Sequence, residues 1–273
     1  MEVLDAQRRD SGSRVKMVFM RIFLVACGVF TALVSGQEKR LTFEVASIKP
    51  VKPGGRGGGI KPKPAGQGYD AVGAPVRLMI SLMYRMPMQH ITGGPGWLDS
   101  DLWDVEAKAD KAYSVDDLHT MFQNLLADEF KLKFHKEIKE GPVYALTVDK
   151  SGPKMKVNDS PQDYEIPIGG GRGGIINGKR VPMEYLCYWL GQVLRNEDRQ
   201  VIDKTGLKGN YDFALSFMPE LPPGFEKANL PPEFLDRPTI FDALKQQLGL
   251  KLEAQKGPVE YYVIDHVEKP AGN

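Results

Sequence analysis

Cysteine is scarce in this chain, which has only Cys27 and Cys187 among its 273 residues. If Cys27 leaves with an N-terminal signal, Cys187 stands alone and no disulfide framework can form. Cys187 lies within the segment MEYLCYWLGQVL, which favours a small buried side chain over a reactive thiol. A catalytic thiol would need a nearby base, and the sequence around Cys187 signals none.

An excess of charge of either sign is also missing. The formal net charge is +1, and residues 1–36 hold five basic and three acidic side chains, which leaves about −1 for the rest. A chain with this balance lacks the positive surface that attracts nucleic acid or an anionic membrane, so we expect neither as a partner. The 42% hydrophobic and 26% charged fractions are ordinary for a globular protein.

Motifs for metal binding and catalysis are equally rare. The four histidines, His90, His119, His135 and His266, form no HxH, HxxxH or HExxH pair. A metal site needs three or four converging ligands, so we expect no metal and no cofactor. No GxSxG motif occurs, although a catalytic triad assembled in space would leave no such local trace.

The N-terminal apolar run, residues 22–34, is shorter than the roughly 20 residues that span a bilayer. It follows Arg21 and ends before small residues, which predicts a signal peptide over residues 1–36 and a mature chain from Gln37. Two alternatives stay open: a lipoprotein cleavage box that would anchor Cys27 to lipid, and an uncleaved anchor. We expect a periplasmic or secreted protein with no transmembrane segment after cleavage.

The stretch that organises the chain is a helix followed by an alternating segment. Residues 116–130 carry apolar side chains at helical spacing, and Ser114 with Asp117 forms a capping box before them. Residues 131–150 alternate in polarity around Gly141-Pro142, which predicts a β-hairpin with its turn at that pair.

The same order returns near the C-terminus. Thr239 with Asp242 forms a second capping box, and a helix and a second hairpin around Gly257-Pro258 follow. This repetition predicts an α+β fold of two pseudo-repeated modules, each with helices packed on a small mixed sheet that ends in a β-hairpin. The expected segments are a signal peptide 1–36, a first module 37–157, a Gly/Pro-rich linker 158–180 and a second module 181–273 with a Pro-rich insertion 219–238.

Candidate ligand-binding residues come from two features. Trp97 and Trp103 flank a turn, where an exposed aromatic ring can hold a sugar or a peptide, although such a ring more often closes the edge of a core. Arg56 and Arg172 lie in glycine-rich runs that are typical of flexible loops but offer a contact for an anion. We expect any ligand to lie near these four residues.

A group of four acids surrounds the same turn and consists of Asp99, Asp101, Asp104 and Glu106. A pair among them would suit glycoside hydrolysis, but four acids around a turn are more often a solvated surface. These residues keep hydrolysis open as an alternative.

Several motifs carry a resemblance to a known family: FEVASIKP, GGPGWL, LLADEFKLKFH, GPVYAL, VIDKTGLKGNYDF, LKQQLGLKLE and VIDHVEKP. Over residues 41–273 the chain resembles an uncharacterised family of exported soil-bacterial proteins with a domain of unknown function. Related domains occur fused to integral-membrane zinc metallopeptidases of the beta-lactam-sensor type, which implies a sensing role. Each half is also distantly similar to the short N-terminal module of secretins and TonB-dependent receptors. The chain lacks both the barrel and HExxH, so those activities do not follow.

The signal, the repetition and the missing catalytic set together favour a non-enzymatic envelope protein that binds an unknown partner, for example through a sheet edge. The first alternative is a sensor or carrier of a small envelope ligand. The second alternative is a hydrolase with a spatially assembled site.

Overall fold

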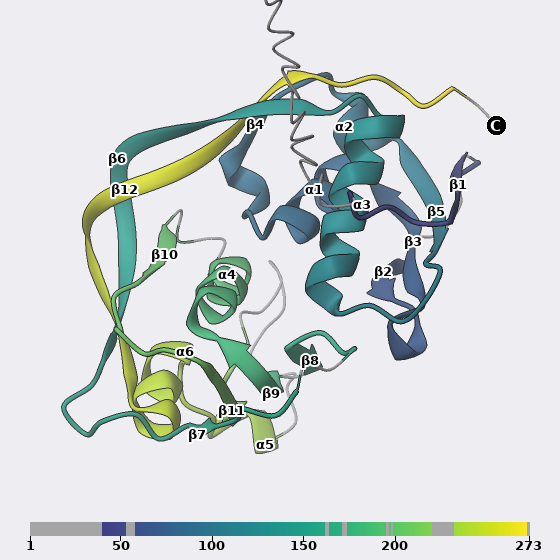
Figure 1. Cartoon of the computed structure of the whole chain (residues 1–273). Coiled ribbons are helices and arrows are strands. Elements are labelled where there is room, and N and C mark those ends of the chain that lie inside the picture. The colour runs from purple at the N-terminus through teal and green to yellow at the C-terminus, as the bar shows by residue number, and fades with distance from the viewer. Residues whose placement is uncertain are drawn as a thin grey trace, which may run out of the picture. The chain divides into compact units, whose positions relative to one another are not determined.

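The computed structural model describes residues 40–52, 58–161, 164–170, 174–194, 197, 199–219 and 232–271, and the account below concerns these residues. Helices and strands are mixed, and the strands form three sheets that are mostly antiparallel. The α+β class is therefore confirmed (Figure 1). The predicted signal peptide, Cys27, Arg56 and Arg172 lie outside the described residues, as does most of the Pro-rich insertion.

The first sheet is antiparallel, with the order β1-β5-β3-β2. Its strands are β1 (Val45–Pro50), β2 (Gly59–Pro62), β3 (Gly68–Pro75) and β5 (Leu102–Lys108). The helical segments of this half are η1 (Pro64–Gly66), α1 (Val76–Tyr84), η2 (Met88–His90), α2 (Trp97–Ser100) and α3 (Val115–Glu129).

A second antiparallel sheet in the other half has the order β7-β11-β9-β8. Its strands are β7 (Lys156–Val157), β8 (Ile168–Gly170), β9 (Ile175–Pro182) and β11 (Asn210–Ser216). The helices of this half are α4 (Met183–Val193), α5 (Pro232–Leu235), α6 (Ile240–Ala243) and the π-helical turn η6 (Leu244–Leu248) that continues α6.

Two long strands link the halves. The strands β6 (Lys133–Val148) and β12 (Leu250–His266) pair antiparallel along almost their whole length, and Figure 1 shows that the pair bends strongly. Two short strands pair parallel with them, β10 (Gln200–Asp203) with β6 and β4 (Ile91–Gly93) with β12. The central sheet is thus mixed and has the order β10-β6-β12-β4.

The predicted hairpins are wrong, because Gly141-Pro142 and Gly257-Pro258 lie inside continuous strands. Gly141 and Gly257 face each other across the ladder, and a Cβ on either would lie 3.0 Å from a valine methyl of the opposite strand. Close approach of a neighbour, rather than a turn, explains these glycines. Both prolines lie outside the segments that pair with β10 or β4. The missing N–H of each proline therefore breaks no hydrogen bond to those two strands.

Two hydrophobic cores follow from this arrangement. The first joins α1, α3 and the first sheet with Tyr262 and Ile264 of β12. The second joins α4, α6 and the sheet of β9 and β11 with Tyr144 and Leu146 of β6. Both long strands reach both cores, because Leu250 of β12 belongs to the second core and Phe134 of β6 packs against the first.

The predicted helix caps and helix faces are confirmed. Ser114 Oγ accepts a hydrogen bond from the Asp117 amide at 3.0 Å, and Thr239 Oγ1 accepts one from the Asp242 amide at 3.1 Å. The apolar side of α3 and the residue after it is buried, as its helical spacing predicts: Leu118, Met121, Phe122, Leu125, Leu126 and Phe130. Cys187 is buried as expected, and desolvation raises the pKa of its thiol, so it is no ready nucleophile.

Candidate functional site

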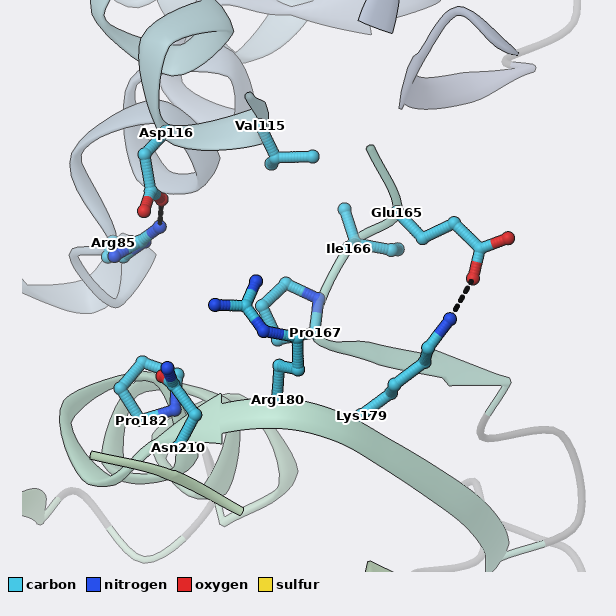
Figure 2. Close-up of a pocket in the computed structure, with 10 residues that line it drawn as sticks. All are labelled: Arg85, Val115, Asp116, Glu165, Ile166, Pro167, Lys179, Arg180, Pro182 and Asn210. Atoms are coloured by element: carbon cyan, nitrogen blue, oxygen red, sulfur yellow. Dashed lines mark hydrogen bonds and ion pairs between the residues drawn. The ribbon is translucent and has the colours of Figure 1, made fainter. Parts of the chain in front are cut away.

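A cleft of about 250 Å³ lies where α1 ends, α3 begins and β9 passes, and we call it the arginine cleft. Figure 2 shows two arginine side chains in it, Arg85 beside Asp116 and Arg180 beside Pro167. Its lining residues are Arg85, Val115, Asp116, Glu165, Ile166, Pro167, Lys179, Arg180, Pro182 and Asn210. Charged groups and apolar walls are therefore mixed in one small space.

Arg85 is held by the protein itself. It follows α1 with a left-handed backbone (φ 52°), forms an ion pair with Asp116 in the first turn of α3, and lies over the ring of Tyr185 at 5.3 Å. These contacts join α1, α3 and α4. The Arg85 guanidinium thus binds a carboxylate and an aromatic ring of the protein, which gives Arg85 a largely structural role.

Arg180 differs in its side chain. Its backbone is also left-handed (φ 51°), and its amide donates to Asp212 Oδ1 at 2.8 Å. That bond is the main reason that the pKa of Asp212 is lowered. Among the described residues, however, no acceptor contacts its buried Nε, and no ion pair involves its guanidinium. In Figure 2 this guanidinium rises from β9 into the cleft beside Pro167.

The charges that line the cleft do not balance. Arg85 pairs with Asp116, and Lys179 Nζ lies 3.9 Å from Glu165 Oε2. Arg180 is the remaining cation of the lining, so one positive charge is left without a carboxylate of the cleft. Val115 and Asp116 also belong to the first turn of α3, where the helix dipole adds positive potential.

A larger groove of about 850 Å³ continues from the cleft, and the two share Glu165, Ile166, Pro167 and Lys179. On its far side Lys63 is bound to Asp70 at 2.7 Å, and this hydrogen bond raises the pKa of Lys63. Tyr164, which is 42% exposed, forms part of the groove. A ligand longer than the cleft would therefore have room to continue.

The structure does not bring the predicted ligand-binding residues together at this cleft. Trp103 is only 5% exposed and packs edge to face against Phe130, with ring centroids 5.6 Å apart. Trp97 is partly buried against the first core, and Lys269 Nζ lies 5.7 Å from its ring. Neither lines the arginine cleft, and the positions of Arg56 and Arg172 lie outside the described residues.

Sequence analysis missed Arg85 and Arg180. Arg85 follows an apolar helix, and Arg180 stands in the run NGKRVP, where a basic pair suggests a solvated strand. Their left-handed backbones leave no mark in the sequence, because the residue type is not glycine.

The four acids of the predicted turn each have a partner of their own. Arg77 Nε donates to Asp99 at 2.7 Å, Lys269 pairs with Asp101 at 2.6 Å, the Gly73 amide donates to Asp104 at 2.7 Å, and Lys63 lies 3.4 Å from Glu106. Each of the four carboxylates is therefore bound to a different group.

The part of the chain that the structure describes has neither a cluster of metal-ligating side chains nor a helix suited to crossing a membrane. Over those residues, no three His, Cys, Asp or Glu side chains gather in a group able to hold a metal ion. No helix there has both the length and the apolar character to cross a membrane.

Comparison with known proteins places the chain in a protein family. No curated protein and no solved structure matches the chain. The family model described as "Protein of unknown function (DUF3738)" matches residues 77–267, a range that begins in α1, after β1, β2 and β3, and includes both long strands and all residues of the arginine cleft. The chain therefore belongs to this domain family of unknown function.

Proposed function

We propose that this chain is a non-enzymatic binding protein that holds the anionic group of a ligand in the arginine cleft. The observation that carries the proposal is Arg180, whose guanidinium enters the cleft and meets no carboxylate among the described residues. An arginine presents a planar fork of donors that matches a carboxylate or a phosphate in two parallel hydrogen bonds. Either anion would also satisfy the buried Nε, which otherwise costs free energy.

Backbone strain supports the same proposal. A residue other than glycine in the left-handed region costs on the order of 1–3 kcal/mol, and such strain gathers at functional sites. Both cleft arginines have this conformation. At Arg85 the ion pair and the ring contact offset the strain. At Arg180 the amide bond to Asp212 and the irregularity of the β9–β11 ladder hold the backbone, and the guanidinium is left for a ligand.

The test is thermal unfolding of the full chain in rising sodium acetate or sodium phosphate, with ionic strength held constant by sodium chloride. One of the two anions should stabilise the wild type in a saturable way, by about 2.7 kcal/mol at a hundred times its dissociation constant. The acetate and phosphate series distinguish a carboxylate from a phosphate ligand. Arg180→Gln should remove the effect.

Arg40→Gln is the matched control, because Arg40 is an exposed arginine that is paired with Asp128 and lies outside the cleft. An Arg180→Gly variant tolerates the left-handed backbone, so loss of binding there reflects the missing guanidinium and not strain. Equal stabilisation of the wild type and Arg180→Gln would refute the proposal.

A second candidate function is protein binding by strand addition. It is supported by Ile138, which is 70% exposed in a part of β6 that pairs only with β12 among the described strands. An open strand edge is a template for a strand of another chain. This candidate is independent of the cleft.

Export and duplication complete the proposal. A cleaved signal over residues 1–36, with lipidation of Cys27 as the alternative, would bring the protein to the periplasm or the exterior; N-terminal sequencing of the exported chain would then begin at Gln37. The two halves would be pseudo-repeats, which is supported by matching sheet orders, β1-β5-β3-β2 and β7-β11-β9-β8. We also propose that the chain is related to exported soil-bacterial proteins. Each half would be distantly related to the short N-terminal module of secretins and TonB-dependent receptors.

A further inference from the structure

Residues 133–142 of β6 form an open strand edge within the described part of the chain. The strand β12 pairs with them on one side, and β10 begins to pair with β6 only at Val143. From His135 to Pro142 most side chains are exposed, which differs from the fully buried stretch Val143 to Leu146. We call residues 136–140, with the sequence KEIKE, the open edge.

The backbone at the centre of the open edge directs its hydrogen-bonding groups away from β12. Ile138 is opposite Glu260 in the ladder, and the Glu260 amide donates to Gln200 Oε1 at 2.9 Å instead of to β6. In an antiparallel pair, the residues at such a position direct their N–H and C=O groups away from each other. The N–H and C=O of Ile138 therefore face outward, toward the space where a further strand would lie.

The side chains of the open edge match a second copy of the same segment. If two copies pair antiparallel about a twofold axis at Ile138, then Glu137 faces Lys139 of the other copy, and Lys136 faces Glu140. Each opposition occurs twice, and the two exposed Ile138 side chains meet at the axis. Opposite charges and apolar side chains directly across a ladder stabilise it, whereas like charges destabilise it.

We propose that the open edge of β6 joins two copies of this chain through an antiparallel strand pair centred on Ile138. The ion pairs within one copy do not oppose this, because Lys139 with Glu137 (2.6 Å) and Lys136 with Glu260 (2.7 Å) are at least partly exposed and contribute little. The pairing covers Ile138 and engages the outward backbone groups of the strand. It requires no contact with the arginine cleft.

Disulfide trapping tests the register. In a Cys27→Ser background, the full chain carries Ile138→Cys or, as the matched control, Glu140→Cys on the same face of the strand. At the axis the two Cα atoms are about 5.5 Å apart, within the range that a disulfide spans. Two copies of residue 140 would be roughly 14 Å apart, out of reach. Cys187 is buried and the pKa of its thiol is raised, so it should not take part in disulfide formation.

We expect covalent dimers of Ile138→Cys to form at least about tenfold faster than those of Glu140→Cys. Adding Glu137→Lys to Ile138→Cys places a lysine opposite Lys139 of the other copy, and this happens twice. The rate of covalent dimer formation should then fall about tenfold. The further change Lys139→Glu restores opposite charges across the axis and should restore the rate. This exchange leaves the net charge of the triple variant the same as that of Ile138→Cys alone.

Three outcomes overturn the proposal: equal rates at positions 138 and 140, a rate insensitive to Glu137→Lys, or no recovery with Lys139→Glu. If the edge instead takes a strand from a different protein, the chain stays monomeric in analytical ultracentrifugation at high concentration. It then crosslinks no faster at position 138 than at position 140. None of these outcomes bears on anion binding by Arg180, so the two proposals fail separately.

Discussion

The two halves of the molecule reach the same helix-to-strand junction by different means. After α3, Lys131 has a left-handed backbone (φ 53°) before the chain enters β6, and its Nζ donates to the Asp128 carbonyl at 2.7 Å. After η6, Gly249 has the same conformation (φ 69°) before β12. A Cβ at Gly249 would lie 1.9 Å from the Gly152 carbonyl oxygen, so only glycine fits there. The geometry is shared, whereas the local crowding decides the residue.

The halves also differ in their buried polar groups. The first core holds the Tyr69 hydroxyl against His119 Nε2 at 3.1 Å, with both residues buried. The buried polar or charged residues of the described chain, Ser81, His90 and His119, all lie in the first half. Acid should therefore destabilise the protein through the buried histidine of the first half.

Core truncation should give the largest effect and test whether the halves unfold together. Phe122→Ala in the first core should lower the free energy of unfolding by about 3–5 kcal/mol, and Leu186→Ala in the second by about 2–5 kcal/mol. Because β6 and β12 contribute to both cores, each variant should shift one common transition. Fluorescence from Trp103 and Trp189 in single-tryptophan variants reports the two halves. Separate midpoints would show that the halves are independent.

Acid should reveal the difference in buried polar groups. Desolvation lowers the pKa of His119 from 6.5 to about 4, so the folded state resists a proton that the unfolded chain accepts. Stability is then fully present above about pH 6.5 and is lost as the pH falls toward 4, by roughly 3 kcal/mol. Urea unfolding at stepped pH measures this slope, and His119→Gln should abolish its part of it. An unchanged slope in that variant would exclude His119 as the cause.

The smallest effects concern the two helix exits. Gly249→Ala adds a clash with the Gly152 carbonyl to a strained backbone and should cost roughly 2 kcal/mol or more. Lys131→Gly relieves the left-handed strain and should stabilise the protein by about 0.5–1 kcal/mol. If the two helix exits share the left-handed geometry, chemical denaturation should show free energies of unfolding that change in opposite directions in the two variants. Two shifts of the same sign would show that the exits are not equivalent.

Local sequence determined the helices and their ends. The caps at Ser114 and Thr239 depend on residues three apart, and the buried side of α3 depends on a period of 3.6, so both were predictable. The burial of Cys187 followed from its apolar neighbours in the same way. Each of these features has its cause within one helix.

Only the tertiary structure decided the course of the long strands and the make-up of the arginine cleft. A Gly-Pro pair has the same local signal in a hairpin turn and in a bent strand, and the deciding contact, Gly141 with Gly257, joins residues far apart in the sequence. Trp103 was predicted at a ligand site but packs in the core, whereas Arg180 gained its importance from a left-handed backbone and a missing carboxylate. Propensity and spacing act over a few residues, while partners in space are chosen by the packing of the whole chain.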